Sequence, residues 1–185
     1  MKNSLTSLRL LKNRNFLFSL SLFAGVLFFD QWLKYVVQNK LPKMCFFCSY
    51  PYGGFGVFKN FLGVQFSIVH TANKGAAWSL FSEYQEVLLL FRIALILFLI
   101  FYACRFSFGK TLFFPYALLI GGAIANIIDY FTYGHVIDMF YFVFWGYSYP
   151  VFNIADTAIF ISVAWMAMAY LFELKNGQIE RKAVK

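Results

Sequence analysis

Four long apolar stretches constrain this sequence more than any other feature. They lie at about residues 16–37, 87–104, 112–128 and 151–172. Each approaches the roughly 20 residues that a helix needs to cross the apolar core of a bilayer. Only 13% of the 185 residues are charged and 61% are hydrophobic, whereas soluble domains are about 25% charged. The composition therefore excludes a soluble globular enzyme and a disordered protein, and it predicts four membrane-spanning helices.

The positive charge predicts the orientation of these helices. Ten of the sixteen Lys and Arg residues lie in the two tails and in the short connection between the second and third stretches, at Lys2, Arg9, Lys12, Arg14, Arg105, Lys110, Lys175, Arg181, Lys182 and Lys185. Cytoplasmic segments of membrane proteins are enriched in Lys and Arg, so we expect both termini in the cytoplasm and residues 38–86 and 129–150 outside. The basic residues do not interleave with aromatic ones, so no nucleic-acid partner is expected.

The first outer segment has the pattern of β-structure. Residues 58–70 are rich in β-branched and aromatic side chains that partly alternate with polar ones, and a turn-rich stretch precedes them. We predict a small extracytoplasmic β element at about residues 57–80, between helices 1 and 2 of an otherwise all-α polytopic membrane protein. No linker or repeat divides the sequence, which predicts one membrane-embedded domain over residues 1–185.

The cysteines and histidines give little support to a metal site. Cys45 and Cys48 form a single nearby pair, whereas a zinc site needs about four ligands. The sequence leaves open whether these two cysteines form a disulfide. The histidines are His70 and His135, and neither belongs to a His-Glu-x-x-His motif. We therefore expect no bound metal.

All four aspartates lie within or at the edge of an apolar stretch, at Asp30, Asp129, Asp138 and Asp156. An ionisable group at membrane depth is costly and indicates a functional site, although a helix cap would explain any single one of them. Asn126 and Asp129 repeat the Asn-x-x-Asp spacing of Asn153 and Asp156, and this spacing places both polar groups on one helix face. We expect two carboxylates to converge below the outer surface, where one keeps its proton and the pair acts as acid and base on a peptide bond.

Two other classes of protein also use buried carboxylates. A small transporter or proton-relay protein would show discontinuous helices in repeated halves, and the first two helices hold no counterpart of the Asn-x-x-Asp pairs. A non-catalytic assembly factor would use the aspartates as hydrogen-bonding groups between helices. Asp→Asn substitution separates these classes from an enzyme, because an amide still forms hydrogen bonds but performs no acid–base chemistry.

Five short motifs resemble those of signal peptidase II, the lipoprotein signal peptidase family of bacterial inner-membrane aspartic proteases. They are DQWLK at 30–34, NKGAAWS at 73–79, GGAIANIID at 121–129, GHVID at 134–138 and FNIAD at 152–156. The resemblance implies an endopeptidase that removes the signal peptide from diacylglyceryl-modified prolipoproteins, cutting immediately before the lipidated Cys. It implies no cofactor, contact with membrane phospholipid, and a multi-pass location in the bacterial cytoplasmic membrane with the active site near the outer face. Nothing in the helices demands a second copy, so a monomer is expected.

The resemblance also implies the roles of individual residues. Asp138 and Asp156 would be the catalytic pair. Substrate-binding or supporting roles would fall to Asn73, Gly75, Asn126, Asp129 and Asn153, together with an ion pair between Asp30 and Lys34 that helps to shape the site. For Lys34, a side chain that snorkels toward the membrane surface is the alternative.

Two positions, Tyr130 and Arg92, are not accounted for by the family pattern. The family commonly has Arg directly after the third-motif aspartate, and this chain has Tyr130 there, which puts in doubt an arginine contact to the substrate. Arg92 lies inside the second apolar stretch and has no role in the resemblance. Snorkelling, or an ion pair with Glu86, would account for it.

Overall fold

The computed structural model describes residues 2–75, 80–105 and 112–175. Its elements, in order, are α1 (Lys2–Lys40), β1 (Phe55–Phe61), β2 (Val64–Asn73), a 3-10 turn (Ser82–Tyr84), α2 (Gln85–Arg105), α3 (Phe113–Tyr133), β3 (Val136–Phe144), β4 (Tyr147–Ser148) and α4 (Ile154–Lys175). Each of the four helices is long and apolar enough to cross a membrane. Trp78 of the second motif, and the basic residues Lys110, Arg181, Lys182 and Lys185, lie outside the described residues.

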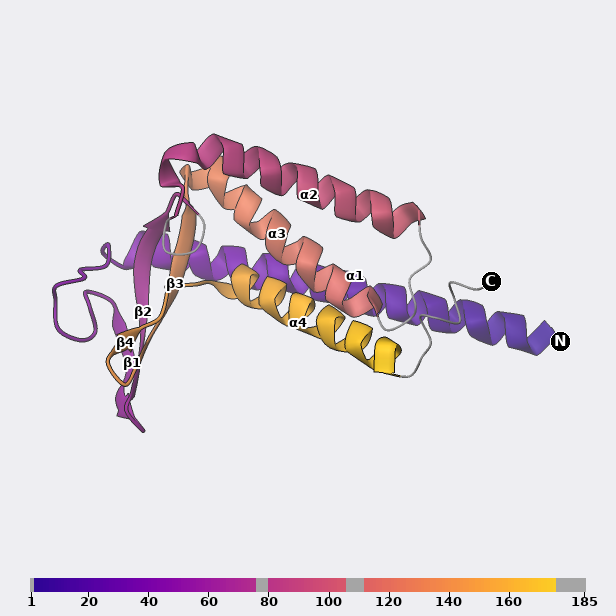
Figure 1. Ribbon diagram of the computed structural model, residues 1–185, viewed down its shortest axis with the longest axis horizontal. Coiled ribbons are helices and arrows are strands. Elements are labelled where there is room, and N and C mark those ends of the chain that lie inside the picture. The colour runs from indigo at the N-terminus through magenta and orange to yellow at the C-terminus, as the bar shows by residue number, and fades with distance from the viewer. Residues whose placement is uncertain (1, 76–79, 106–111, 176–185) are drawn as a thin grey trace.

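The four helices lie side by side, with α3 packed against α1 and α4 and also contacting α2 (Figure 1). Two adjacent glycines permit this close packing. A Cβ added to Gly122 would lie 2.5 Å from the Ala155 carbonyl oxygen on α4, and a Cβ on Gly121 would lie 3.3 Å from the Phe23 ring on α1. Small residues of this kind let the backbones of membrane helices approach one another. The sequence therefore brings the middle of α3 into contact with both α1 and α4.

The four strands form one antiparallel sheet in the order β1-β2-β3-β4. It crosses one end of the helices, opposite the end at which α1 begins and α4 ends (Figure 1). The prediction of an all-α fold is therefore wrong in one respect, because β3 and β4 follow α3, β3 pairs with the outer strand β2, and β4 pairs with β3. In β3, near-continuous apolar sequence reflects burial on both faces, and that pattern does not distinguish a short strand from a buried helix.

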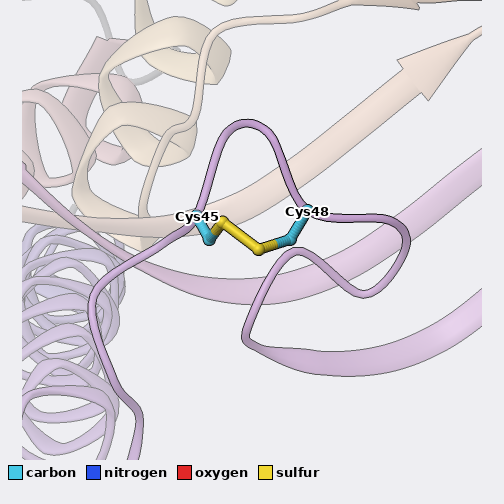
Figure 2. The surroundings of a disulfide bond; sticks show 2 residues. All are labelled: Cys45 and Cys48. Atoms are coloured by element: carbon cyan, nitrogen blue, oxygen red, sulfur yellow. A yellow bond between two sulfur atoms is a disulfide. The ribbon is translucent and has the colours of Figure 1, made fainter.

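The segment between α1 and β1 covers one face of the sheet. Met44 and Tyr52 pack against the buried side chains of Val69, Tyr141 and Val143. The sequence left open whether Cys45 and Cys48 are paired. In the structure they form a disulfide with Cα atoms 5.4 Å apart (Figure 2). Side chains alternate along a strand, so the opposite face of β3 carries Asp138 toward the helices.

The C-terminal end of α3 and the N-terminal end of α4 differ in position from the ends of the predicted apolar stretches, and both ends carry site residues. α3 continues to Tyr133, and Gly134 ends it in the left-handed conformation (φ 74°) with its N–H donated to the Tyr130 carbonyl. Asp129 therefore lies within the last turns of a helix. α4 begins at Ile154, so the preceding residues from 151 are extended and Asn153 lies at the N-cap position.

Candidate active site

The N-terminus of α4 holds the second Asn-x-x-Asp pair as a capping box. The Asn153 side-chain oxygen accepts the Asp156 backbone N–H at 2.8 Å, and the Asp156 carboxylate accepts the Asn153 backbone N–H at 3.3 Å. This reciprocal pattern satisfies two N–H groups that a helix start leaves without partners. The capping interpretation of Asp156 is thus correct, and it fixes the orientation of the carboxylate as well. The second oxygen of this carboxylate accepts a hydrogen bond from the Asn126 amide at 2.8 Å.

Asp138 projects from β3 toward the same place. Its carboxylate accepts one hydrogen bond from the Asn153 side-chain amide at 2.7 Å and another from the Asn73 amide at 2.9 Å. Asn73 ends β2, and its side-chain oxygen in turn accepts the Gly75 N–H at 2.9 Å. Asn153 therefore contacts both carboxylates, because its side-chain amide donates to Asp138 and its backbone N–H donates to Asp156.

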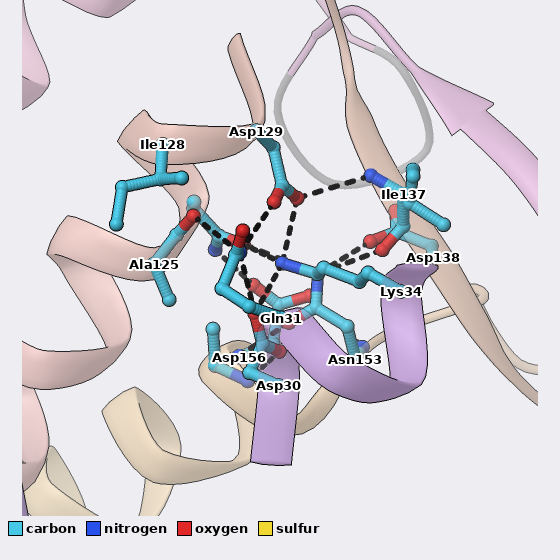
Figure 3. A network of polar contacts seen from close by, with 12 residues as sticks. Asp30, Gln31, Lys34, Ala125, Ile128, Asp129, Ile137, Asp138, Asn153 and Asp156 are labelled. Carbon is cyan, nitrogen blue, oxygen red and sulfur yellow. Dashed lines mark hydrogen bonds and ion pairs between the residues drawn. The ribbon is translucent and has the colours of Figure 1, made fainter. Parts of the chain in front are cut away.

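A buried ion cluster supports this arrangement from the α1 side (Figure 3). The Lys34 ammonium lies 2.7 Å from Asp30 and 2.6 Å from Asp129, and it donates to the Asn126 side-chain oxygen at 3.0 Å. Its side chain is 0% exposed, so the snorkelling alternative for Lys34 is wrong. Asp30 also accepts the Ala155 backbone N–H at 2.8 Å. Lys34 thus links α1 and α3, while Asp30 links α1 to the start of α4.

The cluster also affects the stability of the fold. Removing one partner from a buried ion pair leaves an uncompensated charge and costs about 3–5 kcal/mol. Here Asp129 has further partners, because it accepts a hydrogen bond from Gln31 at 2.7 Å and from the Ile137 backbone N–H at 3.2 Å. Ile137 is the residue before Asp138, so the cluster reaches the strand that carries that carboxylate.

Asp138 and Asp156 open into a cavity of about 500 Å³. Polar groups from several elements line one part of it, and an apolar wall that includes Val151, Phe152 and Phe160 lines another part. The polar residues that line the cavity are Asn73, Arg92, Asn126, Asp138, Asp156 and Thr157. A pocket with apolar walls and a few convergent polar groups is typical of a ligand site.

The electrostatics of the cavity favour a shared proton. Burial, together with the neighbouring Asp156 charge, raises the pKa of Asp138 to about 7. A carboxyl whose pKa lies near neutrality can hold a proton while its partner is ionised, so the pair can act as an acid and a base. No cluster of three or more His, Cys, Asp or Glu residues suited to a metal occurs in the described ranges.

The structure brings together every residue that the sequence placed at the site. Asp30 and Lys34 come from α1, Asn73 and Gly75 from the end of β2 and the loop after it, Asn126 and Asp129 from α3, Asp138 from β3, and Asn153 and Asp156 from the start of α4. The sequence analysis did not identify Gln31 as a site residue, and it assigned no role to Arg92. Gln31 lies in the first motif, directly after Asp30, and this position could have indicated that it belongs to the site. Arg92 donates to the Gly75 carbonyl at 2.9 Å, and only its position inside an apolar stretch marked it.

Tyr130 does not replace the absent arginine. Its ring packs against that of Phe131 in an edge-to-face contact, with centroids 5.5 Å apart, and it is not among the residues that line the cavity.

Comparisons with known proteins identify the family to which this chain is similar. The family model described as Signal peptidase (SPase) II matches residues 22–172. A lipoprotein signal peptidase of Xanthomonas oryzae pv. oryzae is 35% identical over 171 residues, covering 90% of this chain and 96% of the relative. A lipoprotein signal peptidase of Chlamydia pneumoniae is 38% identical over 120 residues, covering 64% of this chain and 70% of the relative.

Solved structures show the same architecture. Two structures described as a bacterial membrane enzyme, solved by the in meso method at 2.3 and 1.9 Å resolution, align with TM-scores of 0.71 and 0.67. Both are 26% identical to this chain, and the first covers 85% of it and 90% of its own length. The second covers 83% of this chain and 92% of its own length.

Proposed function

The chain belongs to the signal peptidase II family of membrane peptidases, and on that premise we propose that Asp138 and Asp156 hydrolyse lipid-modified prolipoproteins immediately before the lipidated Cys. The observation that carries the proposal is the shared contact of both carboxylates with Asn153, through its side-chain amide to Asp138 and its backbone N–H to Asp156, at one cavity. A multi-pass protein with its site at the sheet end of the helices suits a substrate whose lipid anchors the scissile bond near the membrane surface.

The surroundings of the two carboxylates support different roles for them. Asp156 lies in the first turn of α4, where the helix dipole favours a negative charge, and two N–H groups point at it. Asp138 has a pKa raised to about 7 by burial and by Asp156, so it can carry a proton near neutral pH. We assign Asp156 as the base that takes a proton from water and Asp138 as the acid.

The reaction proceeds in two proton-coupled stages. Water, deprotonated by Asp156, attacks the scissile carbonyl carbon while Asp138 donates its proton to the carbonyl oxygen, which gives a neutral tetrahedral diol. Asp156 then returns its proton to the leaving nitrogen, and Asp138 takes one hydroxyl proton as the carbon–nitrogen bond breaks. The products are the signal-peptide carboxyl group and the free amino group of the lipidated Cys, and both aspartates regain their starting states.

The supporting residues serve this chemistry by restraining the carboxylates. Asn153 and Asn126 hold Asp156 from two directions, and Asn73 and Asn153 hold Asp138. Fixed donors reduce the reorganisation needed as charge moves between the two acids. The Lys34 cluster anchors Asn126 and the start of α4 behind them.

The test compares purified wild type, Asp138→Asn and Asp156→Asn on a diacylglyceryl-modified prolipoprotein in detergent. Each amide keeps the size of the side chain but loses acid–base capacity, so we expect activity to fall by at least about 100-fold. Glu83→Gln is the matched control, because Glu83 is exposed on the turn before α2 and should leave cleavage unchanged.

The outcomes separate the parts of the proposal. Thermal unfolding of each variant checks that loss of activity is not loss of fold. Cleavage by both aspartate variants would remove the catalytic assignment. A wild type that fails on the lipid-modified substrate, or that cuts at another bond, would contradict the proposed substrate and cut site.

A further inference from the structure

Arg92 is a charged residue at membrane depth that the proposed chemistry does not use. It lies on α2, within the candidate span Ser82–Tyr102, where an ionisable side chain is costly and indicates a function. An arginine side chain is a planar cation with five N–H donors. Its retention in an apolar helix therefore needs a specific partner.

The position of Arg92 relative to the outer end of α2 can be followed along the helix. Gln85, the first residue of α2, donates to the Gly134 carbonyl at 2.7 Å and so marks the sheet end of the bundle. Arg92 follows it by seven residues, or about 10 Å along the helix axis. The guanidinium thus approaches the cavity from the membrane-embedded side.

Contacts tie Arg92 to the site. Its Nη2 donates to the Gly75 carbonyl at 2.9 Å, Gly75 donates to Asn73 at 2.9 Å, and Asn73 donates to Asp138 at 2.9 Å. Arg92 also lines the cavity itself, and among the described lining residues it alone carries a positive side chain.

The charge of Arg92 does not neutralise the two carboxylates. The salt bridges within the described parts of the chain are those of Lys34 with Asp30 and Asp129, so the pair with Glu86 that the sequence suggested does not form. The Gly75 carbonyl occupies one of the five N–H groups of the guanidinium. The remaining donors are suited to further oxygen acceptors in the cavity.

We propose that Arg92 positions the substrate by donating hydrogen bonds to one of its carbonyl oxygens. This inference rests on the proposed function, since a diacylglyceryl-modified prolipoprotein offers two sources of such oxygens, the peptide backbone and the glyceryl ester groups. A neutral carbonyl oxygen of the substrate is a suitable acceptor, because the guanidinium of Arg92 already donates to another neutral carbonyl, that of Gly75. The fork of N–H groups lets Arg92 bridge Gly75 and the substrate at once.

The experiment measures KM and kcat for wild type, Arg92→Lys and Arg92→Ala on two substrates in detergent. One substrate carries ester-linked acyl chains, and the other carries the same chains through ether bonds and so lacks the ester carbonyls. Lys59→Ala is the control, because Lys59 is an exposed cation on β1, away from the cavity. All four proteins are first checked by thermal unfolding.

We expect Arg92→Ala to raise KM about 10-fold or more on the ester substrate, with a smaller change in kcat. An equal loss on the ether substrate assigns the contact to a peptide carbonyl, whereas a loss confined to the ester substrate assigns it to the ester. Arg92→Lys keeps a charge and a donor for Gly75 but lacks the planar fork, so we expect an intermediate KM. This variant also carries the test if Arg92→Ala does not fold.

Three results would overturn the inference. Wild-type KM in Arg92→Ala would exclude a substrate contact, and wild-type KM in Arg92→Lys together with a loss in Arg92→Ala would reduce Arg92 to holding Gly75. A fall in kcat alone would also place its role away from substrate binding. An inactive wild type would instead contradict the proposed function, and the assignment would fall with it.

Discussion

Protonation of Asp138 connects the stability of the protein to pH. Burial and the Asp156 charge raise its pKa from 3.8 to about 7, whereas an unfolded chain would keep the ordinary value. Between these two pH values the folded state binds more protons than the unfolded state. The contribution of Asp138 to stability is therefore present below about pH 4 and is lost as the pH rises through 7.

We expect Asp138→Asn to remove this dependence, because an amide is neutral throughout. Relative to wild type, the variant should unfold at a higher temperature at pH 8 and at nearly the same temperature at pH 4.5, with a stability difference on the order of 1–3 kcal/mol at the higher pH. Thermal unfolding in detergent at the two pH values measures it, with Glu83→Gln as the control. Parallel pH profiles for wild type and Asp138→Asn would show that Asp138 does not hold the proton.

The contact between α3 and α4 sets the geometry of the site at the level of the elements. A Cβ on Gly122 would lie 2.5 Å from the Ala155 carbonyl oxygen and 3.0 Å from the Ile159 side chain. The first atom belongs to the backbone and cannot rotate away. Ala155 also donates its N–H to Asp30 and precedes Asp156, so a displaced helix start would carry the carboxylate with it.

Gly122→Ala should therefore destabilise the protein by about 1–3 kcal/mol, which is the usual cost of overpacking, and should lower cleavage activity as well. Gly25→Ala on α1 is the matched control, because a Cβ there meets nothing within 4 Å and Ala favours a helix. Unfolding temperature and activity of both variants measure the difference. Equal behaviour of the two variants would show that α3 and α4 tolerate a wider separation.

The orientation in the membrane is a property of the whole molecule. The sheet lies at one end of the helices, whereas α1 begins and α4 ends at the other (Figure 1), and the sequence has its tail cations before the first apolar stretch and after the last. We propose that the sheet end faces outward from the bacterial cytoplasmic membrane, in keeping with the preference of basic segments for the cytoplasm. The disulfide of the outer segment suits an oxidising compartment.

Cysteine labelling tests this orientation. In a Cys104→Ser background, a membrane-impermeant maleimide applied to spheroplasts should label Leu62→Cys, at the exposed β1–β2 turn. It should label Arg14→Cys, at the start of the first candidate span, only after the membrane is permeabilised. Reversed labelling of the two positions would invert the proposed orientation.

Hydropathy was sufficient to predict the four membrane helices, and local spacing indicated the two Asn-x-x-Asp pairs. Bilayer thickness determines how long an apolar stretch must be, so this information is local. The Asn153 and Asp156 pair is likewise local, because a capping box depends on residues three positions apart. The ion pair of Asp30 and Lys34, which the resemblance implied, is also local, because it joins residues four positions apart on one helix.

Only the tertiary structure could reveal the rest. Lys34 contacts Asp129 and Asn126 because α1 and α3 pack together, and no spacing in the sequence encodes that approach. β3 is recognisable as a strand only through its register with β2, which pairs Asp138 with Thr71 and Val136 with Asn73. Arg92 reaches the site through a loop that is distant from it along the sequence. These contacts join segments far apart in the chain, so their geometry depends on how all the elements pack together.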